Sequence, residues 1–244
     1  MTRVTLCARR IGATVEQVPG TGSGTDRTRG VPMYLFSRHA QLEMGDFRGA
    51  MAWAIEQTER VNRLSGLDVS LNSQVFSPAL GTIAWTTVVD SLSELVAANE
   101  VLMASDEYAA GADAGARFLR APADDSVMEL LQVPEDAGGD FEYATSVRAV
   151  LAGGEAARGI AMGVEIAQTA QRITGRPTVF GTAVAGPYGG VGWVTTYPSI
   201  DSLEESRAAL AGHADWLELL DTKATGLYAE VPEVTTQRVY RRIA

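Results

Sequence analysis

The chain repeats itself, and this duplication restricts the fold to an arrangement of two similar units. Two long amphipathic stretches, one opened by Asp46 and one by Glu155, each end in a Gly just after the last apolar position, as helices commonly do. Residues in and around the first stretch recur at one constant spacing: Tyr34, Ser37, Glu56, Gly66 and Pro78 correspond to Tyr143, Ser146, Glu165, Gly175 and Pro187. An ordered series that spans a whole unit indicates an internal repeat rather than chance.

The agreement between the two units continues downstream of the first long helix. Each unit has a β-branched segment with a central Trp, Trp85 or Trp193, followed by an Asp-Ser-Leu sequence that begins at Asp90 or Asp201. Asp is a preferred residue at helix N-caps. We therefore expect a strand containing the Trp and, after it, a helix capped by the Asp.

Each unit is expected to have the order strand, helix, strand, strand, helix, strand. The strand predictions rest on β-branched and aromatic runs bounded by Gly and Pro, and the helix predictions on 3.6-residue spacing. In the first unit the strands are expected near 32–42, 67–77, 81–89 and 126–133, with helical segments at 46–65 and 91–118. In the second, the strands are expected near 141–150, 177–185, 190–197 and 235–243, with helical segments at 154–174 and 201–223.

This order of elements predicts an α+β fold made of two ferredoxin-like βαββαβ repeats. In such a repeat both helices cover one face of a four-stranded sheet, and the other face needs a partner. The two bare faces are expected to close on each other as a barrel with the helices outside. The predicted organisation is an N-terminal extension with a flexible Gly-rich loop (1–30), a first repeat (31–135) and a second repeat (140–244).

The charge and the composition exclude several classes of function. The formal net charge is −10, which argues against a nucleic-acid-binding surface. The basic C-terminal segment, with Arg238, Arg241 and Arg242, is interpreted as a strand with solvated arginines. No apolar run reaches the roughly 18 residues of a membrane span, no secretory signal is recognisable, and Cys7 has no second Cys to pair with. A cytoplasmic protein without membrane or nucleic-acid partners is expected.

Strand alternation predicts which side chains face the barrel interior. On the first strand of each unit, one of the two alternating sets of residues is more apolar and suits packing under the helices. Arg38 belongs to this set but fits it poorly, and it is expected at the barrel rim. The opposite set, and its equivalent on the second strand, is polar. The residues expected inside are Ser37, His39, Asn72, Gln74, Ser146 and Arg148.

These interior residues could support catalysis. His39 can exchange a proton near neutral pH, and the Asn72 amide and the Arg148 guanidinium can polarise a substrate oxygen. Ser37, Gln74, Ser146 and the two Trp residues, Trp85 and Trp193, would bind the substrate. A structural interpretation stands beside this one: an inward His can be a hydrogen-bonded core residue, Arg148 can hold a carboxylate, and the Trp side chains can belong to the core.

Residues 32–244 resemble the dimeric α+β barrel superfamily, which includes antibiotic-biosynthesis monooxygenases, small polyketide cyclases, NIPSNAP-like proteins and the haem-binding chlorite-dismutase group. The marks of the resemblance are the segments from Trp85 to Leu92 and from Trp193 to Leu203. The resemblance implies a cofactor-independent enzyme of specialised metabolism that oxygenates an electron-rich aromatic or cyclises a polyketide-like molecule. It also implies a small-molecule substrate and leaves a homodimer open.

Two alternatives to this enzyme remain open. One is a non-catalytic protein that binds a small molecule in the barrel or fills it with side chains. The other is a haem protein, because the haem-binding branch uses a His of the second repeat as an axial ligand and His213 lies there, although no haem-pocket motif surrounds it. A metal site is not expected, since the chain has only two His and one Cys.

Overall fold

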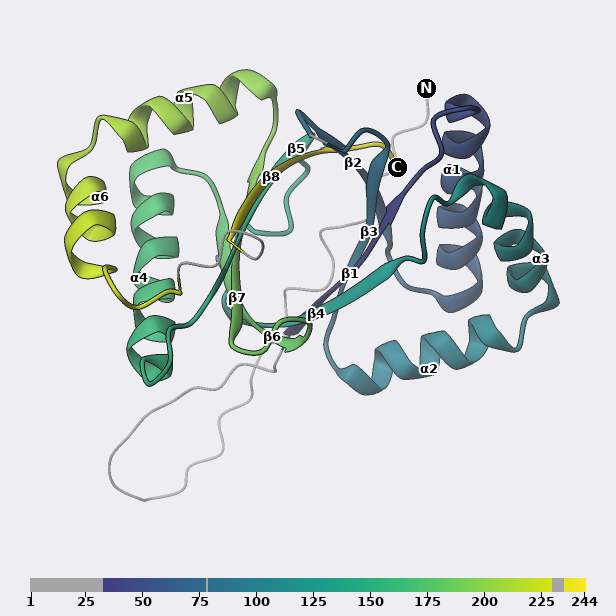
Figure 1. The fold of residues 1–244 in the computed structure, drawn as a ribbon, viewed down its shortest axis with the longest axis horizontal. Helices are drawn as coiled ribbons and strands as arrows, with labels where there is room; N and C mark the ends of the chain where they lie inside the picture. Colours follow the sequence, from purple (N-terminus) through teal and green to yellow (C-terminus); the bar gives the residue numbers. More distant parts are fainter. Residues whose placement is uncertain (1–32, 78, 230–234) are drawn as a thin grey trace.

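The structure is a computed structural model that describes residues 33–77, 79–229 and 235–244, and their strands form one closed barrel flanked by helices (Figure 1). The expected N-terminal extension, residues 1–30, lies outside the described residues. The α+β class and the two βαββαβ repeats predicted from the sequence are confirmed. The boundaries 31–135 and 140–244 stay predictions.

The elements of each unit follow the predicted order. The first unit contains β1 (Met33–Gln41), α1 (Phe47–Ser65), β2 (Ser70–Val75), β3 (Thr82–Val89), α2 (Leu92–Met103), α3 (Asp106–Gly115), the 3₁₀ turn η1 (Ala116–Phe118) and β4 (Asp124–Gln132). The second contains β5 (Tyr143–Val150), α4 (Ala156–Thr174), β6 (Thr178–Ala185), β7 (Gly190–Tyr197), α5 (Ile200–Ala211), α6 (Ala214–Glu218), the π turn η2 (Leu219–Lys223) and β8 (Thr236–Arg242).

The barrel closes because the edge strands of each unit pair with the edge strands of the other unit. Within the units the strand orders are β4-β1-β3-β2 and β8-β5-β7-β6, and the complete ring is β1-β3-β2-β8-β5-β7-β6-β4, with antiparallel pairs at both junctions. Gln74 of β2 lies opposite Tyr240 of β8, and Glu129 of β4 lies opposite Thr182 of β6. The closure leaves neither unit with an unpaired edge strand in the described part of the sheet.

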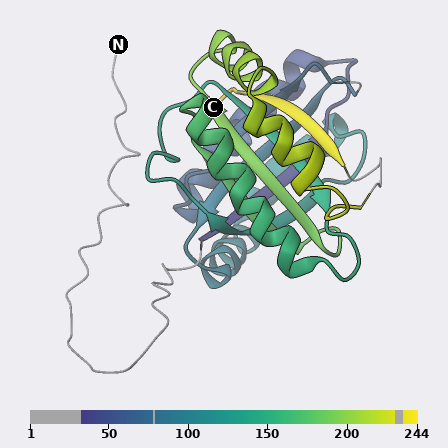
Figure 2. The ribbon, with the colours of Figure 1, turned by 90° about the vertical axis from the view of Figure 1, so that its left-hand side faces the viewer.

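Helices cover the barrel on two sides, and each side has its own hydrophobic core. Figure 1 shows α1, α2 and α3 on one side and α4, α5 and α6 on the other, and Figure 2 shows the second group lying across the outer face of the strands. The first core joins the buried Ala40, Leu71 and Ile83 of the sheet to Ala50 and Ala54 of α1. The second core joins Ala149, Phe180, Val191 and Trp193 of the sheet to Ile166 and Ala167 of α4.

The ends of the long helices follow local sequence signals, with one correction. Gly66 and Gly175 end α1 and α4 with φ of 72° and 66°, a left-handed conformation that favours glycine. The N-caps of α2 and α5, however, are Ser91 and Ser199, whose hydroxyls accept hydrogen bonds from Glu94 N and Ser202 N. The prediction of Asp90 and Asp201 as caps is wrong, because the extended backbone that a cap requires occurs at the serines.

The two expected long helical segments at 91–118 and 201–223 are each broken into shorter helices. In the first, Ser105 is extended and its hydroxyl accepts a hydrogen bond from Tyr108 N, so that α3 starts afresh after α2. In the second, His213 is extended and precedes α6. Each break lets the chain fold back along the outer surface of its unit rather than project from it.

Candidate functional site

The barrel interior, defined as the sheet face opposite the helices, carries the polar residues that alternation predicts. Ala40 on β1 and Ala149 on β5 belong to the two helix-facing cores, so their neighbours His39 and Arg148 point to the other face. β1 and β5 are four places apart in the eight-stranded ring and are therefore opposite each other. His39 and Arg148 thus approach the interior from opposite walls.

Arg148 extends across the barrel interior. Its Nη2 donates a hydrogen bond of 3.3 Å to Ser126 Oγ on β4, a strand separated from β5 by β7 and β6. Ser126 of β4 lies opposite Ser37 of β1. Ser37 is two residues from His39 on the same strand, so the two residues share one face of the sheet. The Arg148 side chain therefore ends close to His39.

Two further side chains reach the same region from β8. The Tyr240 ring lies 6.2 Å from the His39 ring, centroid to centroid, and only 7% of Tyr240 is exposed. Arg238 precedes Tyr240 by two residues and lies opposite Ser146 of β5, so all three share one face. His39, Arg148, Arg238 and Tyr240 form the set that we call the interior cluster.

Two residues of the interior cluster, Arg238 and Tyr240, are absent from the set of interior residues predicted from the sequence. The sequence predicts a strand with solvated arginines here, which holds for the exposed Arg241 but not for Arg238, which is half-buried. Alternation along β8 already separates Arg238 and Tyr240 from Arg241, and this signal could have identified them. Their meeting with His39 depends on the pairing of β8 with β2, which joins the two repeats.

The electrostatics of the interior cluster keep His39 neutral at neutral pH. Burial lowers its pKa to about 4, and the positive charges of Arg148 and Arg238 act in the same direction, while Asp125 opposes them. Burial also lowers the pKa of Arg148, which remains a cation. A neutral imidazole beside guanidinium groups combines a proton acceptor with stabilisation of negative charge.

Within the described ranges 33–77, 79–229 and 235–244, the arginines of the interior cluster differ from neighbouring arginines in having no carboxylate partner. Among the described residues, Arg38 pairs with Asp125 at 2.7 Å, Arg241 with Glu142 at 2.9 Å and Arg242 with Asp140 at 3.9 Å. No ion pair joins Arg148 or Arg238 to a carboxylate of the described part of the chain. The ion pair with Asp125 also explains why Arg38, which is expected at the barrel rim, can lie on the helix-facing side of β1.

The remaining predicted interior residues occupy the predicted face, but their roles differ. The Asn72 side chain is buried, and its Nδ2 approaches Thr86 Oγ1 at 3.1 Å, with longer contacts to Ser70 O and Ala84 O. Its donors are thereby used within the sheet, and Asn72 has no spare N–H to polarise a substrate. The others line the interior: Ser37 beside Ser126, Ser146 beside Arg238 and Gln74 beside Tyr240.

The two Trp residues lie outside the barrel interior. Trp85 Nε1 donates to Thr58 Oγ1 of α1 at 2.9 Å, and Trp193 Nε1 donates to Gly163 O of α4 at 2.8 Å. Both rings therefore fill the space between sheet and helix. This placement favours the core interpretation of Trp85 and Trp193, and their role in substrate binding stays a prediction.

His213 lies at the start of α6, on the helical side of the second unit and apart from the interior cluster. Trp216 of the same helix packs against the core that contains Phe180 and Trp193. A role of His213 as a haem ligand stays a prediction. Among the described residues no group of three or more His, Cys, Asp or Glu could hold a metal ion.

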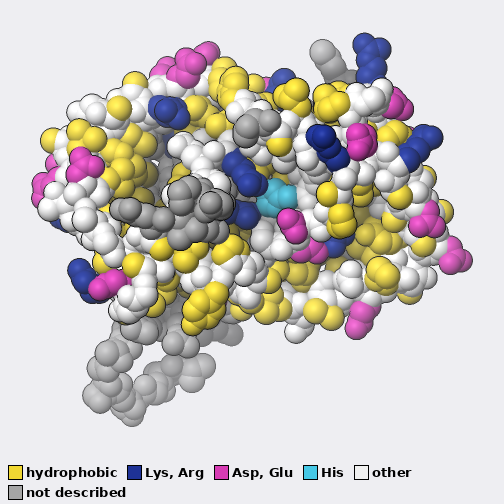
Figure 3. Space-filling model, in the orientation of Figure 1, with side chains coloured by type: hydrophobic (Ala, Val, Ile, Leu, Met, Phe, Trp, Pro, Cys, Tyr) yellow, Lys and Arg dark blue, Asp and Glu magenta, His cyan; other side chains and the backbone are white. Residues whose placement is uncertain are grey.

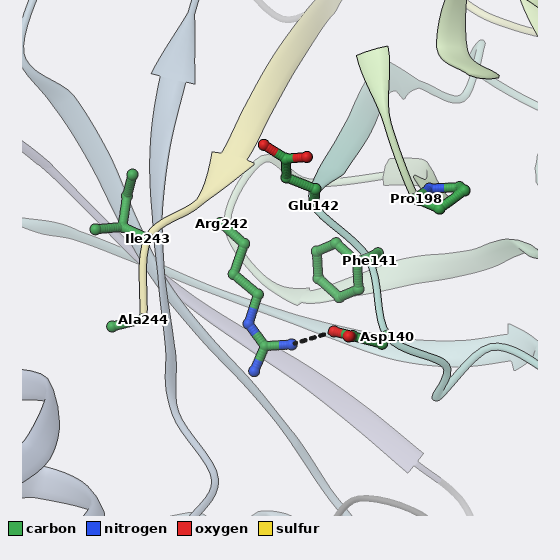
Figure 4. Close-up of a pocket in the computed structure, with 7 residues that line it drawn as sticks. All are labelled: Asp140, Phe141, Glu142, Pro198, Arg242, Ile243 and Ala244. Carbon is green, nitrogen blue, oxygen red and sulfur yellow. Dashed lines mark ion pairs between the residues drawn. The ribbon is translucent and has the colours of Figure 1, made fainter. Parts of the chain in front are cut away.

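A separate hollow of about 470 Å³ lies near the C-terminus, where β8 ends beside β2 of the first unit (Figure 4). Its lining includes Asp140, Phe141 and Arg242, and the Arg242 guanidinium carbon lies 5.5 Å from the Phe141 ring centre. None of the predicted site residues lines this hollow. On the face of the molecule seen in Figure 3, by contrast, basic side chains gather beside a histidine between the two helical layers.

Comparison with known proteins gives matches in structure only. No family model and no curated protein matches the sequence. A proposed monooxygenase from Fusobacterium nucleatum has a TM-score of 0.63 at 9% identity, covering 88% of this chain and 94% of its own. An anthrone oxidase-like protein has a TM-score of 0.58 at 12% identity (88% and 93% covered), and a proposed chlorite dismutase has 0.57 at 11% (87% and 95% covered).

Identities this low establish a common architecture and nothing about the reaction. In the described part of the chain no helix is long and apolar enough to cross a membrane. The chain has the fold of the dimeric α+β barrel superfamily, with both halves of the barrel supplied by one polypeptide.

Proposed function

We propose that this protein is an enzyme that removes a proton from a small organic molecule in the barrel interior, with His39 as the proton acceptor. The observation that carries the proposal is the approach of Arg148 to His39 from the opposite wall, fixed by the bond to Ser126 Oγ. A neutral imidazole accepts the proton, and the guanidinium stabilises the oxyanion that remains. The negative charge that forms also favours protonated His39, which compensates for its low pKa.

The reaction class that best fits this arrangement is the oxygenation of an activated methylene or phenol. The names of two structural neighbours, a proposed monooxygenase and an anthrone oxidase-like protein, support this choice. Proton removal gives an enolate or phenolate whose carbon reacts with dioxygen. A methylene becomes a carbonyl, one oxygen atom enters the product and the other leaves as water, so that the four electrons lost by carbon reduce one dioxygen without a further reductant.

A cyclisation would begin with the same proton removal and would form a carbon–carbon bond instead. The two outcomes are separated by oxygen uptake: oxygenation consumes dioxygen in proportion to product, and cyclisation consumes none. The cytoplasmic location and the homodimer expected from the sequence stay predictions beside this proposal.

The experiment compares the two histidines of the chain. Purified protein is incubated with anthrone and with a polyketide-like β-diketone, and oxygen uptake and product are followed. His39→Gln is expected to lower kcat by about 10²-fold or more, the usual scale for the loss of a general base. His213→Gln, outside the barrel interior, is the matched control and should retain activity. Equal activity of His39→Gln and the unsubstituted protein would remove His39 from the mechanism.

A second candidate, a non-catalytic binding protein, has one observation in its favour. Side chains span the interior: Met128 of β4 lies so close to Gly192 of β7 that a Cβ there would be 3.0 Å from Met128 Cε. Eight-stranded barrels have interiors just wide enough for side chains or one small ligand. A bound ligand that is recovered unchanged after long incubation, with no oxygen uptake and no cyclised product, would favour this candidate.

A further inference from the structure

The interior cluster contains two arginines, Arg148 and Arg238, whose positive charges would be stabilised by a bound anion. Arg148 and Arg238 are both half-buried, and neither has a carboxylate partner among the described residues. The chain carries 30 acidic residues against 20 basic ones, so carboxylates are abundant. Removing a charge from water is costly unless an opposite charge or hydrogen bonds compensate. An anion that enters from solvent would provide this compensation.

The geometry places the two guanidinium groups on one surface. In the register of β5 and β8, Arg148 lies opposite Thr236 and Ser146 lies opposite Arg238. Arg148 and Arg238 are therefore diagonal neighbours on the interior face, at a separation that long side chains bridge easily. One N–H of Arg148 is held by Ser126 Oγ at 3.3 Å, which orients the group and leaves its other donors directed elsewhere.

The walls beside the arginines are aromatic. The rings of His39 and Tyr240 lie 6.2 Å apart with an interplanar angle of 54°. A carboxylate matches the fork of a guanidinium, and a flat ring attached to it matches the faces of His39 and Tyr240. Inorganic phosphate would satisfy the arginines but would make no use of these rings.

We infer that the interior cluster binds a small aromatic carboxylate, with the carboxylate between Arg148 and Arg238 and the ring against Tyr240 and His39. This inference rests on the proposed function only in using the same barrel interior, and it names an anionic substrate class for that site. Binding does not require that His39 accept a proton.

The test measures the binding of three probes at pH 7 by NMR or calorimetry. Benzoate is the aromatic carboxylate, benzamide is its neutral counterpart, and inorganic phosphate represents anions without a ring. Benzoate is expected to bind at least tenfold more tightly than either of the others. Equal binding of benzamide would overturn the electrostatic basis of the inference, and tighter binding of phosphate would overturn the aromatic class.

Two arginine variants locate the binding site. Arg238→Gln is expected to weaken benzoate binding at least tenfold, whereas Arg241→Gln, the adjacent exposed arginine paired with Glu142, is expected to leave it unchanged. If Arg238→Gln does not fold, Arg238→Lys replaces it. Lys keeps the charge but lacks the two-pronged donor geometry, so a several-fold loss is expected. Unchanged affinity in the folded variant would overturn the inference.

His39 supplies an independent readout inside the protein. The charged and titratable groups on its face of the sheet are Arg148 of β5, Arg238 and Tyr240 of β8, and Asp124 of β4, while Asp125 acts on it from the opposite face of β4. Benzoate among them should raise the pKa of His39 by about one unit or more. A His39 titration that is identical with and without saturating benzoate would contradict the placement.

The failure of this inference can be distinguished from failure of the proposed function. If His39→Gln abolishes turnover but still binds benzoate, both stand. If Arg238→Gln binds benzoate as tightly as the unsubstituted protein does while His39→Gln is inactive, only the inference of an anionic ligand is refuted. If benzoate binds as expected but His39→Gln retains full turnover, only the proposed mechanism falls.

Discussion

His39 and Arg148 occupy equivalent positions in the two repeats, and the barrel brings them to face each other. Each lies two residues after the shared serine, Ser37 or Ser146, on a strand opposite the other in the ring. A barrel formed by two identical chains would place the same residue on both walls. A duplicated chain can differ at the two positions, and here one wall carries a proton acceptor while the other carries a cation.

The low pKa of His39 should depend measurably on Arg148. Burial is the largest cause of the shift, and the charge of Arg148 is the next. Replacing Arg148 with Met removes the charge and keeps much of the bulk, so the pKa of His39 should rise from about 4 toward its ordinary value of 6.5 without reaching it. NMR titration of the histidine ring signals measures this change.

Arg241→Met is the control for that titration. Arg241 lies on the opposite face of β8 and pairs with Glu142, so its loss should leave the His39 titration in place. If Arg148→Met and Arg241→Met gave the same His39 pKa as the unsubstituted protein, Arg148 would not lie near the imidazole.

The stability of the protein should fall between pH 6.5 and pH 4 because of His39. The folded protein holds His39 neutral down to about pH 4, whereas the unfolded chain binds the proton near pH 6.5. Unfolding therefore takes up a proton in this range, and the stability that is complete above pH 6.5 decreases as the pH falls, by about 3 kcal/mol at most. Urea unfolding at pH 7 and pH 4.5 measures the decrease.

His39→Gln isolates the histidine from the carboxylates that also titrate in acid. The variant should lose less free energy of unfolding between pH 7 and pH 4.5 than the unsubstituted protein does, by about 2 kcal/mol. An identical loss in both proteins would show that His39 titrates normally in the folded state, and that the interior is open to water at this point.

The close contact of α4 with the second core predicts that Gly163 cannot be enlarged. An Ala at a helix interior is usually more stable than Gly by about 1 kcal/mol. A Cβ on Gly163, however, would overlap the ring of Phe180, which is fully buried, so that the core must shift to accommodate it. Gly163→Ala should therefore lower the free energy of unfolding by about 1–2 kcal/mol.

Gly45→Ala provides the comparison, since nothing lies within 4 Å of a Cβ there. Its stability in urea should be close to that of the unsubstituted protein. The benzoate affinity of Gly163→Ala should also be unchanged, because Gly163 lies on the helical side of the sheet. A Gly163→Ala protein that is as stable as Gly45→Ala would mean that the core around Phe180 is loosely packed.

The corrected helix cap gives a simple stability test. Ser91→Ala removes the hydroxyl that accepts from Glu94 N and should cost about 1 kcal/mol. Asp90→Ala should cost clearly less, because the Asp90 side chain does not cap α2. Thermal or urea unfolding of the two variants compares them directly, and the opposite ranking would restore Asp90 as the cap.

The fold could be predicted because its information is local and repeated. Gly66 and Gly175 mark equivalent helix ends, and alternation on β1 and β5 separates His39 and Arg148 from the alanines that pack under the helices. A period of two along a strand assigns faces without knowledge of the partner strands. The predicted interior residues of these strands accordingly lie on the predicted face.

The remaining features depend on contacts that the sequence does not encode locally. Both faces of the Trp85 and Trp193 strands mix apolar residues with Thr or Gly, so the pattern does not show which face points inward; the indoles bond to Thr58 of α1 and Gly163 of α4. Tyr240 reaches His39 only because β8 pairs with β2 of the other repeat. Nothing near β8 in the sequence indicates that pairing.

The most direct test of the account is a crystal structure of the protein with an unreactive aromatic carboxylate such as benzoate. The account predicts density in the barrel interior, with oxygen atoms within hydrogen-bond distance of the Arg148 guanidinium and the ring beside His39 and Tyr240. Density between the sheet and the helices, next to Trp85 or Trp193, would contradict it and would transfer the site to the other face of the sheet.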